Sequence, residues 1–165
     1  MITRNERRQE KTKIKKKLRN PLVRKILKDE IERGTETEVY RLDDDGTGNP
    51  MFFNISAMRK WAEQNCETFA MPVDFDRASR LIESGAVEPD HIRDHTIHTE
   101  LKPIIVCQGL VGGDQIVDGA HRFVAMCAGS AKFNLNPPIP CYVLQPNEWK
   151  PFVIAASVAR ACGFK

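Results

Sequence analysis

Positive charge is concentrated in the first part of this 165-residue chain. Residues 1–33 contain 13 of the 25 Lys and Arg residues but only 5 of the 22 Asp and Glu residues, a net charge of +8. Apolar residues are sparse before Pro21, so the start of this segment cannot supply a hydrophobic core of its own. Residues 34–165 have a net charge of −5. We therefore expect a basic N-terminal arm or helix over 1–33 and a single folded domain over 34–165.

The charge of the arm favours an interaction with a polyanion. The candidate nucleic-acid-binding residues share this density of positive charge: Arg7, Arg8, Lys15, Lys16, Lys17 and Arg19. After Pro21, the spacing of apolar residues predicts an amphipathic helix over 22–31 with a charged outer face. DNA or RNA is one partner that fits the arm, and docking on a protein is the plainer alternative.

Several classes of protein are not expected from the sequence. No apolar run reaches the roughly 18 residues that a membrane-spanning helix needs, and the N-terminal segment lacks the apolar stretch of a secretory signal. The number of cysteines is odd, none forms a Cys-x-x-Cys pair, and most lie in apolar runs, which favours reduced core thiols over disulfides. These cysteines are Cys66, Cys107, Cys127, Cys141 and Cys162. We expect a cytoplasmic protein with no membrane partner.

The first half of the folded region predicts a β-hairpin and two helices. Two apolar stretches within 38–55 flank a polar turn, and its three adjacent Asp residues lack the alternating spacing of a calcium loop. A helix is expected to begin with Ser56 as its N-cap and to end at Asn65. A second helix is expected over 75–84.

The second half predicts a second hairpin, a helix, a further strand and a terminal helix. A continuous apolar run at 104–107 is typical of a buried strand, and a Gly-Gly turn connects it to a strand at 115–118. A helix over 120–128 is expected to end at the glycine that follows it. A strand over 139–144 and an Ala-rich helix over 151–162, packed on the sheet, complete the expected elements.

The five residues Asp118-Gly119-Ala120-His121-Arg122 lie where the strand is followed by the helix. The first turn of a helix exposes backbone N–H groups and the positive end of its dipole, so phosphate binds there. Gly119 permits a sharp turn, and Arg122 offers a planar fork of donors. His121 adds a donor or a titratable proton, while Asp118 is suited to orient it, accept a proton or contact a metal. The plainer alternative makes Asp118 an N-cap and Arg122 a surface cation.

This motif also carries a family resemblance. The segment 116–125, with the Lys-Pro-Ile-Ile-Val strand at 102–106 before it and the Ile-Pro-Cys-Tyr-Val strand at 139–143 after it, resembles the ParB/sulfiredoxin superfamily. The resemblance covers about residues 95–145. It implies an α+β fold, a small mixed sheet with flanking helices, to which the basic helical arm is added. It also implies that nucleotide phosphates bind at Gly119, Ala120, His121, Arg122 and Lys102.

Within this superfamily the motif is most similar to the Asp-Gly-His-His-Arg pattern of free serine kinases. Ala120 stands where sulfiredoxins have their nucleophilic Cys, so sulfinic acid reduction is not expected. The resemblance implies ATP or another NTP with Mg²⁺, and transfer of the terminal phosphate to a hydroxyl or to water. Asp118 and Glu100 are then the candidate base and metal contacts, and His121 the third catalytic candidate. The alternative is a ParB-like DNA- or RNA-binding module that uses the arm and has no catalytic activity.

Overall fold

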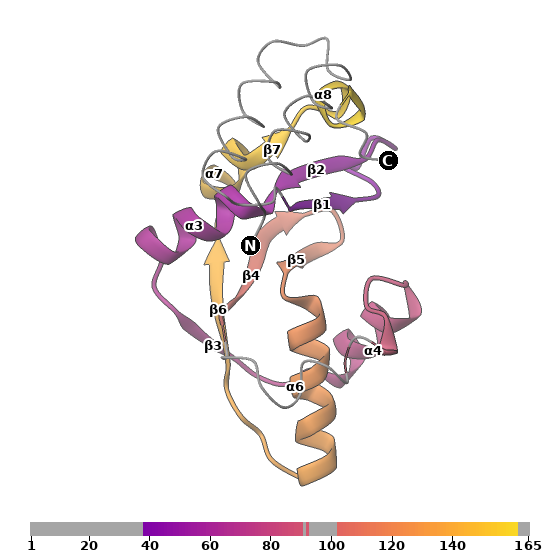
Figure 1. Cartoon of the computed structure of the whole chain (residues 1–165), viewed down its shortest axis with the longest axis vertical. Helices are drawn as coiled ribbons and strands as arrows, with labels where there is room; N and C mark the ends of the chain where they lie inside the picture. Colours follow the sequence, from indigo (N-terminus) through magenta and orange to yellow (C-terminus); the bar gives the residue numbers. More distant parts are fainter. Residues whose placement is uncertain (1–37, 91, 93–101, 162–165) are drawn as a thin grey trace, which may run out of the picture. The chain divides into compact units, whose positions relative to one another are not determined.

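The structure is a computed structural model that describes residues 38–90, 92 and 102–161 (Figure 1). The arm over 1–33 with its helix at 22–31, and the candidate acid Glu100, lie outside these residues, so the predictions made for them stay predictions. The described chain forms two compact units. One contains residues 38–60 and 150–161, and the other contains residues 61–149. In the described part of the chain, no helix combines the length and apolar character needed to cross a membrane.

The first unit is built on the predicted hairpin. Strands β1 (Val39–Leu42) and β2 (Met51–Asn54) pair in antiparallel fashion. The carboxylates of Asp44 and Asp45 accept backbone N–H bonds within the connecting loop at 2.7–2.9 Å. The acidic loop is therefore a turn held by its own side chains, as the sequence predicts.

The end of the chain differs from the single helix expected over 151–162. A 3₁₀ turn (Lys150–Phe152) leads into strand β7 (Val153–Ile154), which pairs antiparallel with β2 and completes the sheet order β1-β2-β7. Helix α8 (Ala156–Ala161) follows and packs against β2. The expected helix is wrong in its first half because two β-branched residues find a partner strand about 100 residues earlier in the sequence.

Helix α3 (Ile55–Asn65) begins one residue before the expected N-cap. The side chain of Asn54 accepts a hydrogen bond from the N–H of Ala57 at 3.0 Å, which is the capping interaction expected of Ser56. The hydroxyl of Ser56 instead accepts a bond from the backbone N–H of Glu38 at 2.8 Å. The helix was predicted, but the residue that caps it was not.

The second unit contains a four-stranded mixed sheet with the order β3-β6-β4-β5. Strands β4 (Ile104–Leu110) and β5 (Gly113–Asp118) form the predicted antiparallel hairpin. Strand β6 (Ile139–Leu144) runs parallel to β4, and the short strand β3 (Phe69–Met71) pairs antiparallel with β6 at the sheet edge. The expected α+β class with a small mixed sheet is confirmed at this coarse level, while β3 was not predicted.

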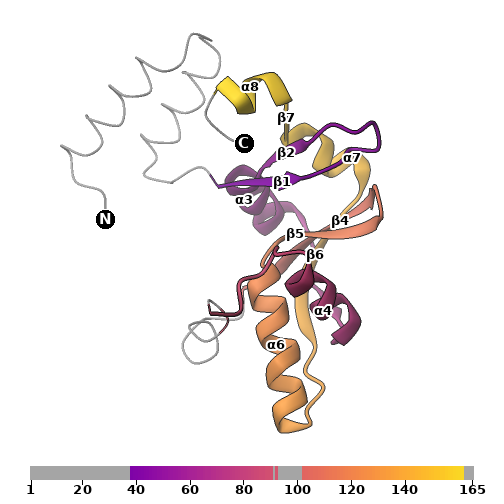
Figure 2. The same ribbon diagram turned by 90° about the vertical axis from the view of Figure 1, so that its right-hand side faces the viewer.

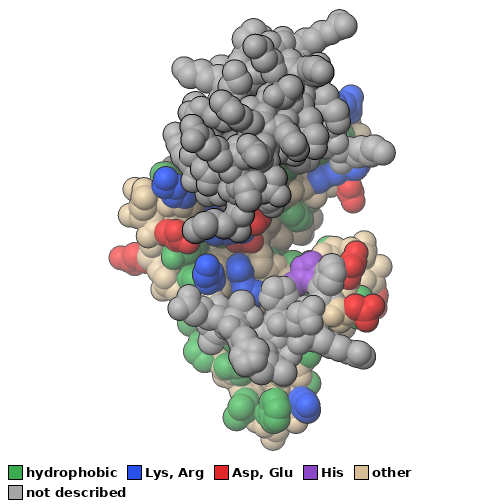
Figure 3. Space-filling model, viewed as in Figure 1, with side chains coloured by type: hydrophobic (Ala, Val, Ile, Leu, Met, Phe, Trp, Pro, Cys, Tyr) green, Lys and Arg blue, Asp and Glu red, His purple; other side chains and the backbone are tan. Residues whose placement is uncertain are grey.

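Helix α6 (Ala120–Phe133) is longer than the expected 120–128 and runs through Gly129. It ends at Asn134, a non-glycine residue with a φ of 50° whose N–H bonds to the carbonyl of Ser130. At this end, Phe133 and Leu135 are 64% and 62% exposed. Figure 3 shows a group of hydrophobic side chains over the lower end of α6.

Helices α4 (Phe75–Glu83) and α6 lie side by side (Figure 2), and the core of this unit forms where they meet the sheet. Asp74 caps α4 by accepting a bond from the N–H of Arg77 at 2.9 Å. The most buried residues of this core are apolar: Ala78, Val87, Ile104, Val106, Ile116, Phe123, Val124, Cys127, Ile139 and Cys141. The described cysteines are free thiols, and all but the half-buried Cys66 are buried, as expected of core cysteines.

Candidate functional site at the strand–helix turn

The predicted motif lies at a sharp turn between β5 and α6. Strand β5 ends at Asp118, and Gly119 adopts the left-handed conformation with a φ of 84° and a ψ of 22°. Helix α6 begins at Ala120, and its first internal hydrogen bond joins the N–H of Phe123 to the carbonyl of Gly119 at 2.9 Å. Because the N-cap is a glycine, it offers no side chain to cap the first turn of α6. The positive end of a 14-residue helix therefore lies at the motif without a side-chain acceptor from its N-cap.

The guanidinium of Arg122 lies under this turn rather than at the surface. Its Nη2 donates to a carboxylate oxygen of Asp118 at 3.4 Å and to the carbonyl of Pro103 at 3.3 Å. The side chains of Arg122 and Asp118 are only 20% and 10% exposed. Both plainer alternatives are therefore wrong, because Arg122 is not a surface cation and Gly119, rather than Asp118, is the N-cap of α6.

One donor of this guanidinium has no acceptor in the described part of the chain. The Nε of Arg122 is buried and has no hydrogen-bond partner among the described residues. A buried N–H without an acceptor destabilises the folded state by about 1–3 kcal/mol, and more when the group is charged. An oxygen atom supplied by a ligand would remove that cost.

Gly119 is required by the packing of the turn as well as by its backbone conformation. A Cβ at this position would lie 2.6 Å from the Nη2 of Arg122 and 2.7 Å from the Cγ2 of Ile104. Both distances are far inside van der Waals contact. The missing side chain therefore provides the space in which the guanidinium meets Asp118.

His121 is engaged on a different side of the helix. Its Nε2 accepts a hydrogen bond from the backbone N–H of Glu88, beyond the end of α4, at 3.3 Å. In this contact the imidazole of His121 acts as an acceptor, not as a donor. The structure thus joins Asp118 and Arg122 to the start of β4, and joins His121 to the segment after α4.

Of the two other predicted site residues, Lys102 and Glu100, the structure describes only Lys102. Lys102 is exposed and immediately precedes Pro103, so it lies one residue from the carbonyl that Arg122 contacts. The metal pair of Asp118 and Glu100 stays a prediction, since Glu100 lies outside the described residues. Among the residues that are described, no group of three or more His, Cys, Asp and Glu side chains is placed to hold a metal ion. A single carboxylate such as Asp118 still fits Mg²⁺ that arrives bound to phosphates.

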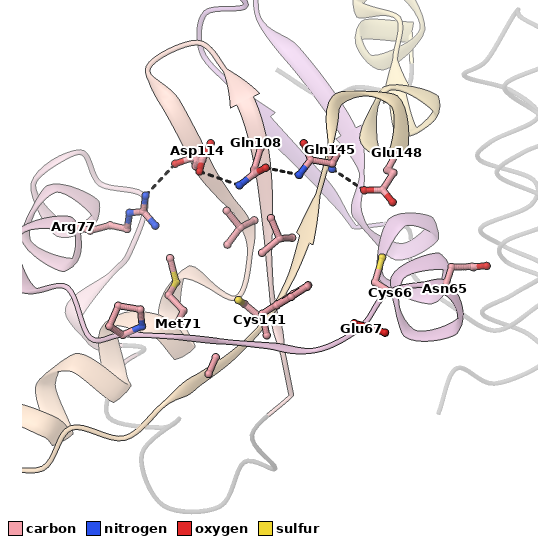
Figure 4. Close-up of a pocket in the computed structure, with 15 residues that line it drawn as sticks. Asn65, Cys66, Glu67, Met71, Arg77, Gln108, Asp114, Cys141, Gln145 and Glu148 are labelled. Atoms are coloured by element: carbon pink, nitrogen blue, oxygen red, sulfur yellow. Dashed lines mark hydrogen bonds between the residues drawn. The ribbon is translucent and has the colours of Figure 1, made fainter.

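Sequence reasoning missed a pocket of about 690 Å³ on the same sheet (Figure 4). It is lined by Val106 and Gln108 of β4, by Cys141 and Val143 of β6, and by Gln145, which directly follows β6. Alternate residues of a strand share one face. The side chains that line the pocket change from valine to glutamine along each segment, from Val106 to Gln108 and from Val143 to Gln145. This repeated change is the sequence signal that could have indicated a pocket with an apolar part and a polar part.

Comparisons of the chain with models of protein families, with curated proteins and with solved structures found no match. The ParB/sulfiredoxin resemblance of the motif therefore stays a prediction, and function is inferred from the residues themselves.

Proposed function

We propose that the protein binds ATP or another nucleoside triphosphate, with the phosphates held at the Asp118–Arg122 turn. The observation that carries this proposal is the buried Nε of Arg122, which has no acceptor among the described residues and lies in the first turn of a helix whose N-cap is a glycine. Phosphate oxygens satisfy both features, because they accept hydrogen bonds from a guanidinium and carry the negative charge that a helix N-terminus favours. Gly119 and the backbone of Ala120 would form the turn around the phosphates. Lys102 would neutralise part of their charge.

The ion pair at the turn suggests how binding would prepare the reaction. In the structure the carboxylate of Asp118 is held by Arg122 at 3.4 Å. A phosphate that attracts the guanidinium would release this carboxylate to accept a proton from a substrate hydroxyl or from water. The attacking oxygen would form a new bond to the terminal phosphorus, the bond to the bridging oxygen would break, and a nucleoside diphosphate would leave. Mg²⁺ bound to the phosphates would neutralise charge, and His121 would orient the substrate.

The binding step is tested by thermal unfolding of the full chain with ATP, ADP, CTP and GTP, each with Mg²⁺. A nucleotide that binds the folded state raises its melting temperature. Arg122→Lys keeps the charge but loses the fork of donors, so the shift should disappear. The exposed Arg80 on α4 supplies the control Arg80→Ala, which should keep the full shift. The binding proposal fails if no nucleotide raises the melting temperature, or if both variants respond alike.

The transfer step has its own test. Asp118→Asn retains an acceptor for Arg122 but cannot take a proton, so nucleotide should still bind while release or transfer of phosphate stops. Turnover in this variant at the wild-type rate would contradict the role of Asp118 as a base.

The charge of the arm favours a second function, the binding of DNA or RNA through Arg7, Arg8, Lys15, Lys16, Lys17 and Arg19. Residues 1–33 carry a net charge of +8. Such binding releases counterions, so the affinity should fall steeply as salt is added. Fluorescence anisotropy with labelled DNA and RNA measures this dependence, and deletion of residues 1–20 should abolish binding. Binding that is insensitive to salt would contradict this function.

A further inference from the structure

The pocket described above is separate from the Asp118–Arg122 turn. It lies within the unit of residues 61–149, and none of the turn residues lines it. Its volume of about 690 Å³ falls in the range of sites that enclose small organic ligands. Strand β5 borders both sites, with Asp114 in the pocket wall and Asp118 at the turn. Asp114 and Asp118 are four positions apart in an extended strand, a separation of about 13 Å.

The floor of the pocket is apolar. Val106 and Val143 lie directly opposite each other on the parallel strands β4 and β6, and Cys141 is one pleat away. Burial raises the pKa of the Cys141 thiol, so this group stays neutral at physiological pH. Phe69 on the edge strand β3 also lines the pocket and is 54% exposed. A ligand with an apolar or aromatic body would cover the exposed ring of Phe69 and the partly exposed side chain of Val143.

One wall is a row of hydrogen-bonded polar side chains (Figure 4). The amide of Gln145 donates to the side-chain oxygen of Gln108, whose own amide nitrogen lies 3.5 Å from a carboxylate oxygen of Asp114. Arg77 of α4 donates to the backbone carbonyl of Asp114 at 3.3 Å. These contacts link the polar side chains of the wall to one another without a ligand.

The charge of the lining is negative. The lining contains three carboxylates and one guanidinium. The carboxylates are those of Glu67, Asp114 and Glu148, and the guanidinium is that of Arg77. Within the described residues neither Glu67 nor Glu148 forms an ion pair. Burial and the nearby negative charge of Glu148 together raise the pKa of the Cys66 thiol, so that charge acts on the pocket lining. A phosphate or carboxylate ligand would be repelled here, whereas a cation would be attracted.

We propose that this pocket binds a small organic cation, an ammonium group carried on an apolar or aromatic body. The body would lie on the floor against Val106, Val143 and Phe69. The ammonium group would lie toward Glu67 and Glu148, at the end of the pocket that Cys66 lines. This site is independent of nucleotide binding, since the two sites share no residue and favour ligands of opposite charge.

The test uses three probes that share a phenyl ring and differ in charge: phenethylamine, 2-phenylethanol and 3-phenylpropionate. Each is titrated into the full-length, ¹⁵N-labelled protein, and backbone amide shifts report where and how tightly it binds. The amine should perturb the pocket residues and bind about 5- to 10-fold more tightly than the alcohol, which corresponds to about 1 kcal/mol from a partly exposed charge pair. The carboxylate should bind most weakly.

Variants separate the contribution of charge from that of the apolar floor. Glu67→Gln with Glu148→Gln should lower the affinity for the amine to that for the alcohol and leave the alcohol unchanged, because a Gln at 148 can still accept the bond from the N–H of Gln145. Phe69→Ala should weaken the amine and the alcohol alike. Glu83→Gln, an exposed acid outside the pocket, is the matched control and should change nothing. The Trp149 indole resonance, whose N–H donates to the carbonyl of Gln108 at 2.9 Å, reports that the wall stays folded.

Three results would overturn the proposal. These are the absence of binding by any probe at millimolar concentration, equal affinity for the amine and the alcohol, and an affinity for the amine that the paired Gln variants do not reduce. Arg122→Lys should leave the affinity for the amine unchanged. Failure of nucleotide binding and failure of this site are therefore observed separately.

Discussion

The guanidinium of Arg122 meets the carboxylate of Asp118 at 3.4 Å across a glycine whose missing side chain leaves the space for that contact. The Asp-Gly-x-x-Arg spacing therefore stabilises the turn itself, without any ligand. It joins the end of a strand to the first turn of a helix, and the carbonyl of Pro103 ties both to the neighbouring strand. A phosphate bound as proposed would compete with a carboxylate that is already in place, so its binding would be coupled to rearrangement of the ion pair.

Gly119→Ala should destabilise the fold by about 2–4 kcal/mol. The left-handed φ of 84° costs a side chain about 1 kcal/mol, and a Cβ only 2.6 Å from the Nη2 of Arg122 would also displace the guanidinium. Urea unfolding measures the loss in free energy of unfolding. The variant should also lose any response to nucleotide, since Arg122 can no longer keep its position.

Gly85→Ala is the matched control for that substitution. Gly85 has a similar φ of 75°, but nothing lies within 4 Å of the Cβ that would be added. This variant should lose about 1 kcal/mol from backbone strain alone. Equal losses in the two variants would contradict the tight packing of Arg122 against the turn.

Asp118→Ala should cost about 1–3 kcal/mol of folding free energy, because among the described residues it leaves the Nη2 of a mostly buried guanidinium with the carbonyl of Pro103 alone as acceptor. Asp118→Asn keeps an oxygen acceptor and should cost less. A double-mutant cycle with Arg122→Ala isolates the interaction between the two side chains. Additive losses in the cycle would show that the pair contributes nothing beyond its separate residues.

Local sequence signals predicted the elements around the site. Strand β7 and the pocket could not be predicted in this way, because both depend on pairing between strands that lie far apart in the sequence. The hairpins and the strand–helix turn follow from strand periodicity and turn residues within about 15 positions, and they are confirmed. Strand β7 forms because Phe52 and Phe53 lie opposite its two residues. The pocket exists because β6 lies parallel to β4, which places Val143 beside Val106. No local pattern encodes either pairing.

The end of α6 shows the same limit at a single residue. Gly129 was expected to end the helix, but it lies inside it, and Asn134 adopts the left-handed conformation instead. Asn134→Gly should therefore raise the free energy of unfolding by about 0.5–1 kcal/mol, and Asn134→Ala should lower it by about 1 kcal/mol. Gly129→Ala should be stabilising by about 0.5–1 kcal/mol, because nothing lies within 4 Å of its added Cβ. Destabilisation by Gly129→Ala, measured by urea unfolding, would place the helix end where the sequence suggested.

Stability should fall at alkaline pH, and Cys107 should account for a measurable part of the fall. This thiol is fully buried in β4, and burial raises its pKa from an ordinary value of 9.0 to about 12. Above pH 9 the unfolded chain loses this proton while the folded chain keeps it, so the stabilisation is complete below pH 9 and is lost as the pH rises toward 12. Between about pH 8 and about pH 10 the loss from this group is about 1 kcal/mol.

Cys107→Ala removes the titrating group, so its free energy of unfolding should depend less steeply on pH than that of the wild type. Ile105→Val is the matched control, since it trims another fully buried side chain of β4 that does not titrate. That variant should lose about 1 kcal/mol equally at every pH. Urea unfolding at intervals across the alkaline range gives the three curves. If the Cys107→Ala curve runs parallel to the wild-type curve, the thiol ionises equally in the folded and unfolded chains, and its burial does not contribute to alkaline unfolding.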